Sequence, residues 1–154
     1  MRELRRRALT MKPATLGFKK DSAFPHVYGA LMELKVNDVA ITIVSLRDGA
    51  TSLYTTSTFG VLGAGDHKKV RDATFKFLKI AEKRWEFAKP TKDFSYPSKD
   101  QVRFFLLGYD GVRTLETTTH VFEAPLVRES ILANTGSDVL TQIRLVSGVG
   151  KTGE

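Results

Sequence analysis

The sequence contains no cysteine among its 154 residues. This absence excludes disulfides, thiolate nucleophiles, cysteine-ligated zinc and iron–sulfur clusters. A chain of this length buries roughly two thirds of the surface that its unfolded form exposes, so it folds without a covalent or metal staple. We therefore expect one domain, and the lack of cysteine fits a cytoplasmic protein.

Long apolar runs and catalytic signatures are also missing. No run approaches the ~18–20 residues that a membrane span needs. The sequence lacks the G-x-S-x-G nucleophile motif, and its three histidines, His26, His67 and His120, do not have the spacing of metal ligands. We expect no cofactor, no metal and no catalytic residues, and an enzyme remains the lesser alternative.

Positive charge is concentrated at the start of the chain. The net charge is +7, but the first twenty residues hold seven Lys and Arg against one acid. The rest of the chain therefore carries only +1. Since no apolar stretch follows Arg5–Arg7, a secretory signal is not expected, and Met11 is an alternative start.

This charge distribution sets the predicted domain boundaries. Residues 1–23 are predicted to form a basic flexible tail, 24–146 a single folded domain, and 147–154 a flexible C-terminus. A basic tail also offers contacts to nucleic acid, because clustered Arg neutralises phosphates.

Two hairpins dominate the strand prediction. Val39–Leu46 is apolar and β-branched, and residues 51–58 return after Asp48-Gly49. The apolar run 101–109 and the return 112–122 repeat the pattern around Asp110-Gly111. An Asp-Gly pair between two such runs favours a type I′ turn, in which both central residues have positive φ.

A long helix is predicted between the hairpins. Apolar residues over 66–89 follow one helical face, with Asp66 as the N-cap and a stop before Pro90. Shorter helices are predicted over 25–34, over 124–133 and from Ser137 to Val146. The resulting order, α-β-β-α-β-β-α, gives an α+β fold: an antiparallel sheet built from two Asp-Gly hairpins and covered by the long amphipathic helix and the terminal helices.

A glycine-rich loop joins the first hairpin to the long helix. Backbone amides at such a position can bind an anion, so weak candidates for a phosphate site are Gly60, Gly63, Gly65, Lys68 and Lys69. The glycine spacing does not match the dinucleotide pattern. A tight connection, in which glycine supplies unusual backbone angles, is the favoured interpretation.

Two other sites are alternatives. One is a small-ligand or enzymatic site near the 59–67 loop, Glu116 and His120. The other is a nucleic-acid surface formed by the tail and helix 66–89, which carries eight bases against four acids. A solvated outer face explains the helix charges more simply.

The order of elements resembles the roadblock/LC7-like modules of the profilin-like class. The resemblance is carried by Val39–Leu46, the Arg47-Asp48-Gly49 turn, the return strand 51–58 and helix 66–89, and it covers about residues 25–146. Roadblock modules usually have a fifth strand, which the sequence does not reveal. The resemblance implies a non-enzymatic homodimer that docks small GTPases or motor-type partners.

The leading hypothesis is therefore a homodimeric interaction or regulatory module. Its partner would be a second copy or another protein, and nucleic acid is not the expected partner. Large apolar side chains predicted at the surface mark contacts, so the interface candidates are Tyr54, Phe75 and Phe87.

Overall fold

The computed structural model describes residues 2–57, 59–123 and 128–148. Its centre is a seven-stranded antiparallel sheet in the order β4-β3-β2-β1-β6-β7-β5. The strands are β1 (Val27–Val36), β2 (Val39–Leu46), β3 (Thr51–Thr55), β4 (Gly60–Val61), β5 (Lys89–Pro90), β6 (Gln101–Gly108) and β7 (Gly111–Thr118). The α-helices are α1 (Arg2–Thr10), α2 (Lys68–Arg84) and α3 (Arg128–Ser147). The predicted α+β class is confirmed.

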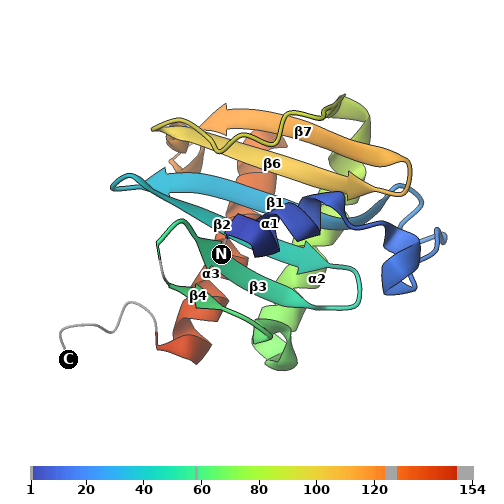
Figure 1. Ribbon diagram of the computed structural model, residues 1–154, viewed down its shortest axis with the longest axis horizontal. Helices are drawn as coiled ribbons and strands as arrows, with labels where there is room; N and C mark the ends of the chain where they lie inside the picture. The colour runs from blue at the N-terminus through green and yellow to red at the C-terminus, as the bar shows by residue number, and fades with distance from the viewer. Residues whose placement is uncertain (1, 58, 124–127, 149–154) are drawn as a thin grey trace.

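The helices lie on both sides of the sheet (Figure 1). α2 and α3 cover one face, which we call the inner face, while α1 crosses the other, the outer face. Short 3-10 helices link these elements: η1 (Pro13–Leu16), η2 (Ala64–Asp66), η3 (Trp85–Phe87) and η4 (Thr119–Phe122). No helix of the described residues is long and apolar enough to cross a membrane.

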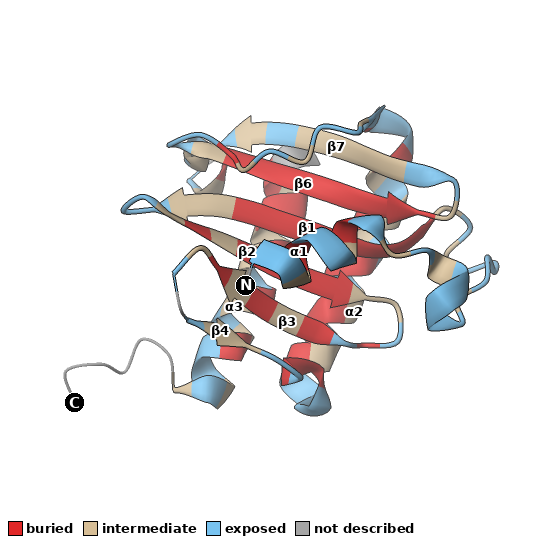
Figure 2. Ribbon diagram, in the orientation of Figure 1, coloured by how far each residue is buried: buried red, intermediate tan, exposed pale blue. Residues whose placement is uncertain are grey.

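Two apolar clusters fill the space on either side of the sheet. The larger cluster lies on the inner face and includes Phe77 from α2, Phe104 from β6 and Ile143 from α3. The smaller one lies on the outer face and is formed by Leu9, Tyr28, Leu31, Val44, Phe105 and Leu107. Figure 2 shows the consequence: β1 and β6 are buried along most of their length, whereas much of α1 faces solvent.

The helix predicted over 25–34 is wrong, because this segment forms the central strand β1. β1 is buried on both faces, so its apolar residues form a nearly continuous run instead of alternating with polar ones. That run matched helical spacing by coincidence. Asn37 and Asp38 have φ of 49° and 66°. They form the two-residue turn that joins β1 to β2.

The first predicted hairpin is confirmed, but its turn is not type I′. β2 has the predicted bounds, and β3 covers the first five residues of the predicted return. Among the turn residues only Gly49 has positive φ, and its amide donates to the Leu46 carbonyl at 2.9 Å. In the second hairpin, Gly111 alone has positive φ.

The helix boundaries differ from the prediction in two places. α2 begins after His67, which is its N-cap, while Asp66 belongs to η2. α3 is one helix through Gly136, where a break was expected. A Cβ on Gly136 would lie 2.6 Å from the Met32 sulfur, so this glycine allows the helix to approach the sheet. The start of the predicted 124–133 helix lies outside the described residues. Residues 149–154 of the predicted flexible C-terminus also lie outside them.

The N-terminal segment departs most from the prediction. Residues 2–10 form α1, where a tail without regular structure was expected. Arg5 and Leu9, one helical turn apart, are both buried. The basic segment is therefore part of the folded domain, and its charges belong to the outer face.

Candidate functional site

The centre of the outer face holds a charged residue that is completely buried. Glu33 lies in the middle of β1 and is 0% exposed. The register of β1 with its two neighbouring strands places Glu33 opposite Thr42 on β2 and opposite Arg103 on β6. Arg103 is in turn opposite Glu116 on β7. Four polar residues thus form one row across four strands of an otherwise apolar surface.

The N-terminal helix supplies the cation that neutralises Glu33. Arg5 donates from Nε to Glu33 Oε2 at 2.5 Å and from Nη2 to Oε1 at 2.8 Å. The Thr42 hydroxyl donates to the same carboxylate at 2.5 Å. A guanidinium that meets a carboxylate with two parallel bonds is the strongest common form of a protein ion pair.

An aromatic ring fixes the other side of this guanidinium. Arg5 Cζ lies 3.9 Å from the ring centre of Tyr96. Tyr96 belongs to the segment 91–100, whose Phe94 packs edge-on against Phe105 of β6. Because planar Arg stacks on aromatic rings better than Lys does, this site is suited to arginine.

The remaining charges of the row are paired separately. Arg103 donates from Nε to Glu116 Oε1 at 3.0 Å, and it also bonds Ser95. Gln101 donates to the second oxygen of Glu116 at 2.8 Å. Arg5 is therefore the cation that bonds the Glu33 carboxylate, and Thr42 adds a neutral hydrogen bond.

α1 is held on the outer face by few apolar contacts. Leu9 is its only fully buried apolar residue, while Leu4 and Ala8 are half-buried. Beyond the helix end, the Tyr28 hydroxyl donates to the Met11 carbonyl at 3.0 Å. A nine-residue helix is unstable in isolation, so these contacts and the Arg5 ion pair keep it folded and docked.

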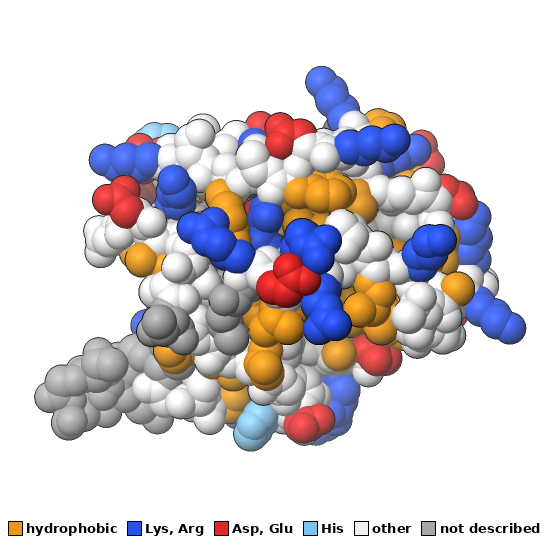
Figure 3. All heavy atoms as spheres, in the orientation of Figure 1, with side chains coloured by type: hydrophobic (Ala, Val, Ile, Leu, Met, Phe, Trp, Pro, Cys, Tyr) orange, Lys and Arg blue, Asp and Glu red, His pale blue; other side chains and the backbone are white. Residues whose placement is uncertain are grey.

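Three of the seven N-terminal bases form salt bridges within the described part of the protein. Arg5 is buried, Arg6 pairs with Glu3, and Lys20 pairs with Asp110. Figure 3 shows the outer face, where Lys and Arg side chains surround hydrophobic ones. This surface is a covered apolar face with basic residues around it, and the aromatic residues beneath are occupied by packing.

The predicted anion site is a close-packed connection. Gly60 lies in β4, and Gly63 has φ of 69°. A Cβ on Gly65 would overlap the carbonyl oxygen of Gly49, so the loop packs directly on the first hairpin turn. Lys68 pairs with Asp72 at 2.8 Å, and Lys69 is exposed.

The alternative ligand site is not assembled. The 59–67 loop flanks β4 at one edge of the sheet, whereas Glu116 is on β7 and His120 follows β7. Five strand spacings separate β4 from β7, which is roughly 24 Å. Among the described residues, no group of three His, Asp or Glu could hold a metal ion.

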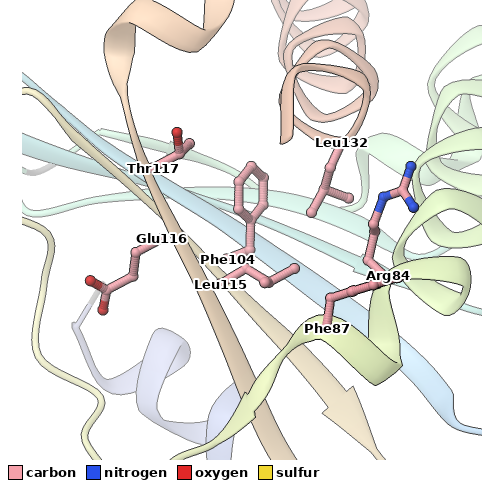
Figure 4. A pocket seen from close by; sticks show the side chains of 7 residues that line it. All are labelled: Arg84, Phe87, Phe104, Leu115, Glu116, Thr117 and Leu132. Carbon is pink, nitrogen blue, oxygen red and sulfur yellow. The ribbon is translucent and has the colours of Figure 1, made fainter. Parts of the chain in front are cut away.

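The predicted interface residues do not form one patch. Tyr54 lies on the outer face beside α1, and Phe75 of α2 contacts the Gly49 turn. Phe87 is 49% exposed in η3, beyond the C-terminal end of α2. It borders a pocket between the inner face and the helices, formed with Phe104, Leu115 and Leu132 (Figure 4). The free space there is about 20 Å³, enough for a single water molecule.

A histidine–glutamate pair lies at the start of β1. His26 Nδ1 is 2.8 Å from Glu82 Oε2, and Oε1 of Glu82 accepts the backbone amides of His26 and Val27. The His26 ring stacks on Trp85, whose ring Arg113 also covers at 4.2 Å. Because Glu82 is committed to two backbone amides, we interpret this pair as the anchor of β1 to α2.

Sequence reasoning missed Glu33, Arg5 and Arg103 as site residues. The available signal was a charge inside each of two apolar runs, Glu33 in residues 27–34 and Arg103 in residues 101–108. A buried ionised group requires a partner of opposite charge. No partner was sought for Glu33, because β1 was expected to be a helix.

The close packing of the glycine loop predicts the effect of a substitution. Gly65→Ala should lower the free energy of unfolding by about 1–3 kcal/mol, since the added methyl meets a backbone carbonyl that cannot move aside. Gly63→Ala, in the same loop, introduces only backbone strain, because its nearest atom would be 3.9 Å away. Urea denaturation measures both, and a smaller loss for Gly65→Ala would contradict the close packing.

Burial of Tyr28 predicts a loss of stability in alkali. Burial and the neighbouring Tyr109 raise the pKa of Tyr28 from 10 to about 12. The folded state favours the protonated hydroxyl, so its contribution is complete below pH 10 and is lost as the pH rises toward 12. In urea denaturation between pH 8 and 11.5, Tyr28→Phe should show a flatter pH dependence than the wild type. Parallel curves would contradict this prediction.

Comparison with known proteins adds no assignment. No family model, curated protein or solved structure matches the chain. The functional proposal therefore depends on the geometry of the outer face.

Proposed function

We propose that the protein is a non-enzymatic interaction module and that its outer face receives a short amphipathic helix bearing arginine. The observation that supports this proposal is the fully buried Glu33, which α1 neutralises with Arg5. In this view α1 occupies the binding site of its own chain.

The argument begins with the cost of burying Glu33. A buried ion pair generally adds little stability compared with well-packed apolar residues, because both charges must leave water. Leu31, Val44 and Phe105 already make the surrounding face apolar. A carboxylate at its centre therefore contributes specificity: an occupant without a correctly placed cation would leave Glu33 buried and unpaired.

The occupant can be described from α1 itself. Arg5 and Leu9 are four residues apart and thus on one helical face. Arg5 meets Glu33 and Tyr96, while Leu9 enters the apolar cluster. The partner should accordingly present an arginine and, four residues later, a large apolar residue on a helix.

The weak attachment of α1 supports its replacement. Only two of its side chains are fully buried. The segment that joins it to the body of the protein is short. Segment 18–24 is fixed by Arg47 and Tyr109, which both bond the Lys19 carbonyl. Residues 11–17 are then the hinge, and they can span about 24 Å when extended.

A second copy of the chain is the simplest partner of this kind. Every copy carries one α1 and one outer face, so exchange of α1 between two copies would give a symmetric homodimer. This proposal keeps the homodimer expected from the sequence and gives it a different interface from Tyr54, Phe75 and Phe87. Docking of small GTPases or motor-type partners, implied by the roadblock-like resemblance, stays a prediction, as does the cytoplasmic location.

A peptide tests the site directly. A fluorescent peptide of residues 1–12 should bind full-length Arg5→Glu at least about tenfold more tightly than wild type, because the wild-type site is filled by its own helix at high effective concentration. The same peptide carrying Arg5→Glu should not bind either protein. Fluorescence anisotropy measures both.

Two controls make the result interpretable. Leu9→Ala in the full chain weakens α1 docking without a like-charge pair at Glu33, so it should also expose the site if Arg5→Glu fails to fold. Arg5→Lys in the peptide should bind more weakly, since Lys lacks the two-pronged contact. Folded variants that do not bind the peptide, or that bind its Arg5→Glu form equally, would overturn the proposal. Light scattering then reports whether the wild type is a dimer that Arg5→Glu converts to a monomer.

A further inference from the structure

A cavity lies beside α1 on the outer face, between the helix and the β2–β3 hairpin. Its volume is about 190 Å³. It is open to solvent on one side and is large enough for a small organic molecule. The pocket at Phe87 is about tenfold smaller, whereas the grooves at Trp85 and between α2 and α3 are larger, about 320 and 420 Å³.

The walls of the cavity are mainly apolar. Seven of its eleven lining residues have apolar side chains: Leu4, Ala8, Met11, Leu16, Val44, Leu46 and Ala50. They come from three segments, namely α1, the hinge that follows it, and the β2–β3 hairpin. Such walls favour the apolar body of a ligand.

Three of the four polar lining residues offer donors to an anion. Arg7 lines the cavity and makes no salt bridge to any described residue. Ser52 and Tyr54 add hydroxyl groups, which also bond each other. The fourth, Thr51, has its hydroxyl bonded to the Gly49 carbonyl and to Thr74. None of the eleven lining residues is acidic.

Two other surface grooves have acidic residues in their linings. The groove at Trp85 includes Glu86 and Asp110 beside Arg113, and the one between α2 and α3 includes Asp72 and Asp138 beside its lysines. A cation with no acidic residue in the lining thus sets the cavity beside α1 apart from these grooves.

We propose that this cavity binds a small aliphatic monocarboxylic acid of about six carbons in total. The apolar body fills the space between Ala8, Val44 and Leu46, and the carboxylate meets Arg7 and the hydroxyls of Ser52 and Tyr54. The ligand class follows from the volume, the apolar walls, and a lining that contains Arg7 and no acidic residue.

The ligand would also regulate the helix-binding face, a consequence that rests on the proposed function. α1 forms one wall of the cavity through Leu4, Arg7 and Ala8. The cavity exists only while α1 is docked, so a ligand inside it stabilises the closed form. By linkage, the acid and an incoming helix that lacks these lining residues must weaken each other's binding, whereas an α1 donated by a second copy would rebuild the same wall.

Hexanoate is the probe for this site, with 1-hexanol and acetate as controls for the apolar body and the carboxylate. In a titration followed by amide NMR shifts of the full chain, hexanoate should give saturable changes at Leu4–Met11 and Ser52–Tyr54. 1-Hexanol should bind at least about tenfold more weakly, and acetate should cause no saturable change. Arg7→Gln should reduce hexanoate affinity to that of 1-hexanol.

A cavity-filling variant provides the second test. Ala8→Leu places three further carbons in the cavity and should abolish hexanoate binding, whereas Thr10→Leu, on the exposed side of the same helix, should leave it unchanged. Absence of saturable hexanoate binding to wild type, or equal binding of hexanoate and 1-hexanol that Arg7→Gln does not alter, would overturn the proposal. Hexanoate binding would support the cavity proposal even if the peptide of residues 1–12 does not bind. The two experiments therefore test the two proposals independently.

Discussion

The ion pair between Arg5 and Glu33 is the interaction on which the outer face depends. It joins the first helix to the central strand across 28 residues of sequence, at a carboxylate that is fully buried. Without a cation, the apolar face would hold an unpaired charge, which is among the most unfavourable arrangements in a protein interior. The ion pair therefore determines both where α1 lies and what kind of segment can lie there.

The two faces of the sheet are stabilised differently. The inner face is covered by two long helices whose large side chains interlock with β1, β2 and β6. Glycines at Gly65 and Gly136 allow backbones to approach closely there. The outer face is covered by one short helix and the irregular segment 91–100, with a cavity left beside the helix. A rigid scaffold thus carries a face whose cover is attached by few contacts.

Much of the fold was predictable from local sequence. The β-branched run of β2, the apolar run of β6 and the helical periodicity of α2 each depend on neighbours within a few residues, and these elements were confirmed. β1 was not predictable in this way, because burial on both faces removes the alternation that distinguishes a strand. α1 was missed because its docking depends on long-range contacts, the Arg5–Glu33 ion pair and the burial of Leu9, which helical periodicity does not reveal.

The site was harder to predict than the fold for the same reason. Arg5 was assigned to a flexible tail, for which contact with nucleic acid was only an alternative. Its true partner lies in a strand that was assigned as a helix. Glu33, Thr42 and Arg103 come together only through strand register, which depends on the pairing of β1 with both β2 and β6. The sequence does contain the complementary charges, but the distances between them depend on how the strands pair in the sheet.

The central claim is that α1 is an exchangeable cover and opens independently of the sheet. Native-state hydrogen exchange on the wild-type chain measures this most directly, because it gives an opening free energy for each amide. We predict that the hydrogen-bonded amides of α1 are at least about tenfold less protected than those at the centres of β1 and β6. Equal protection in α1 and β1, showing that they open only together in global unfolding, would contradict the account.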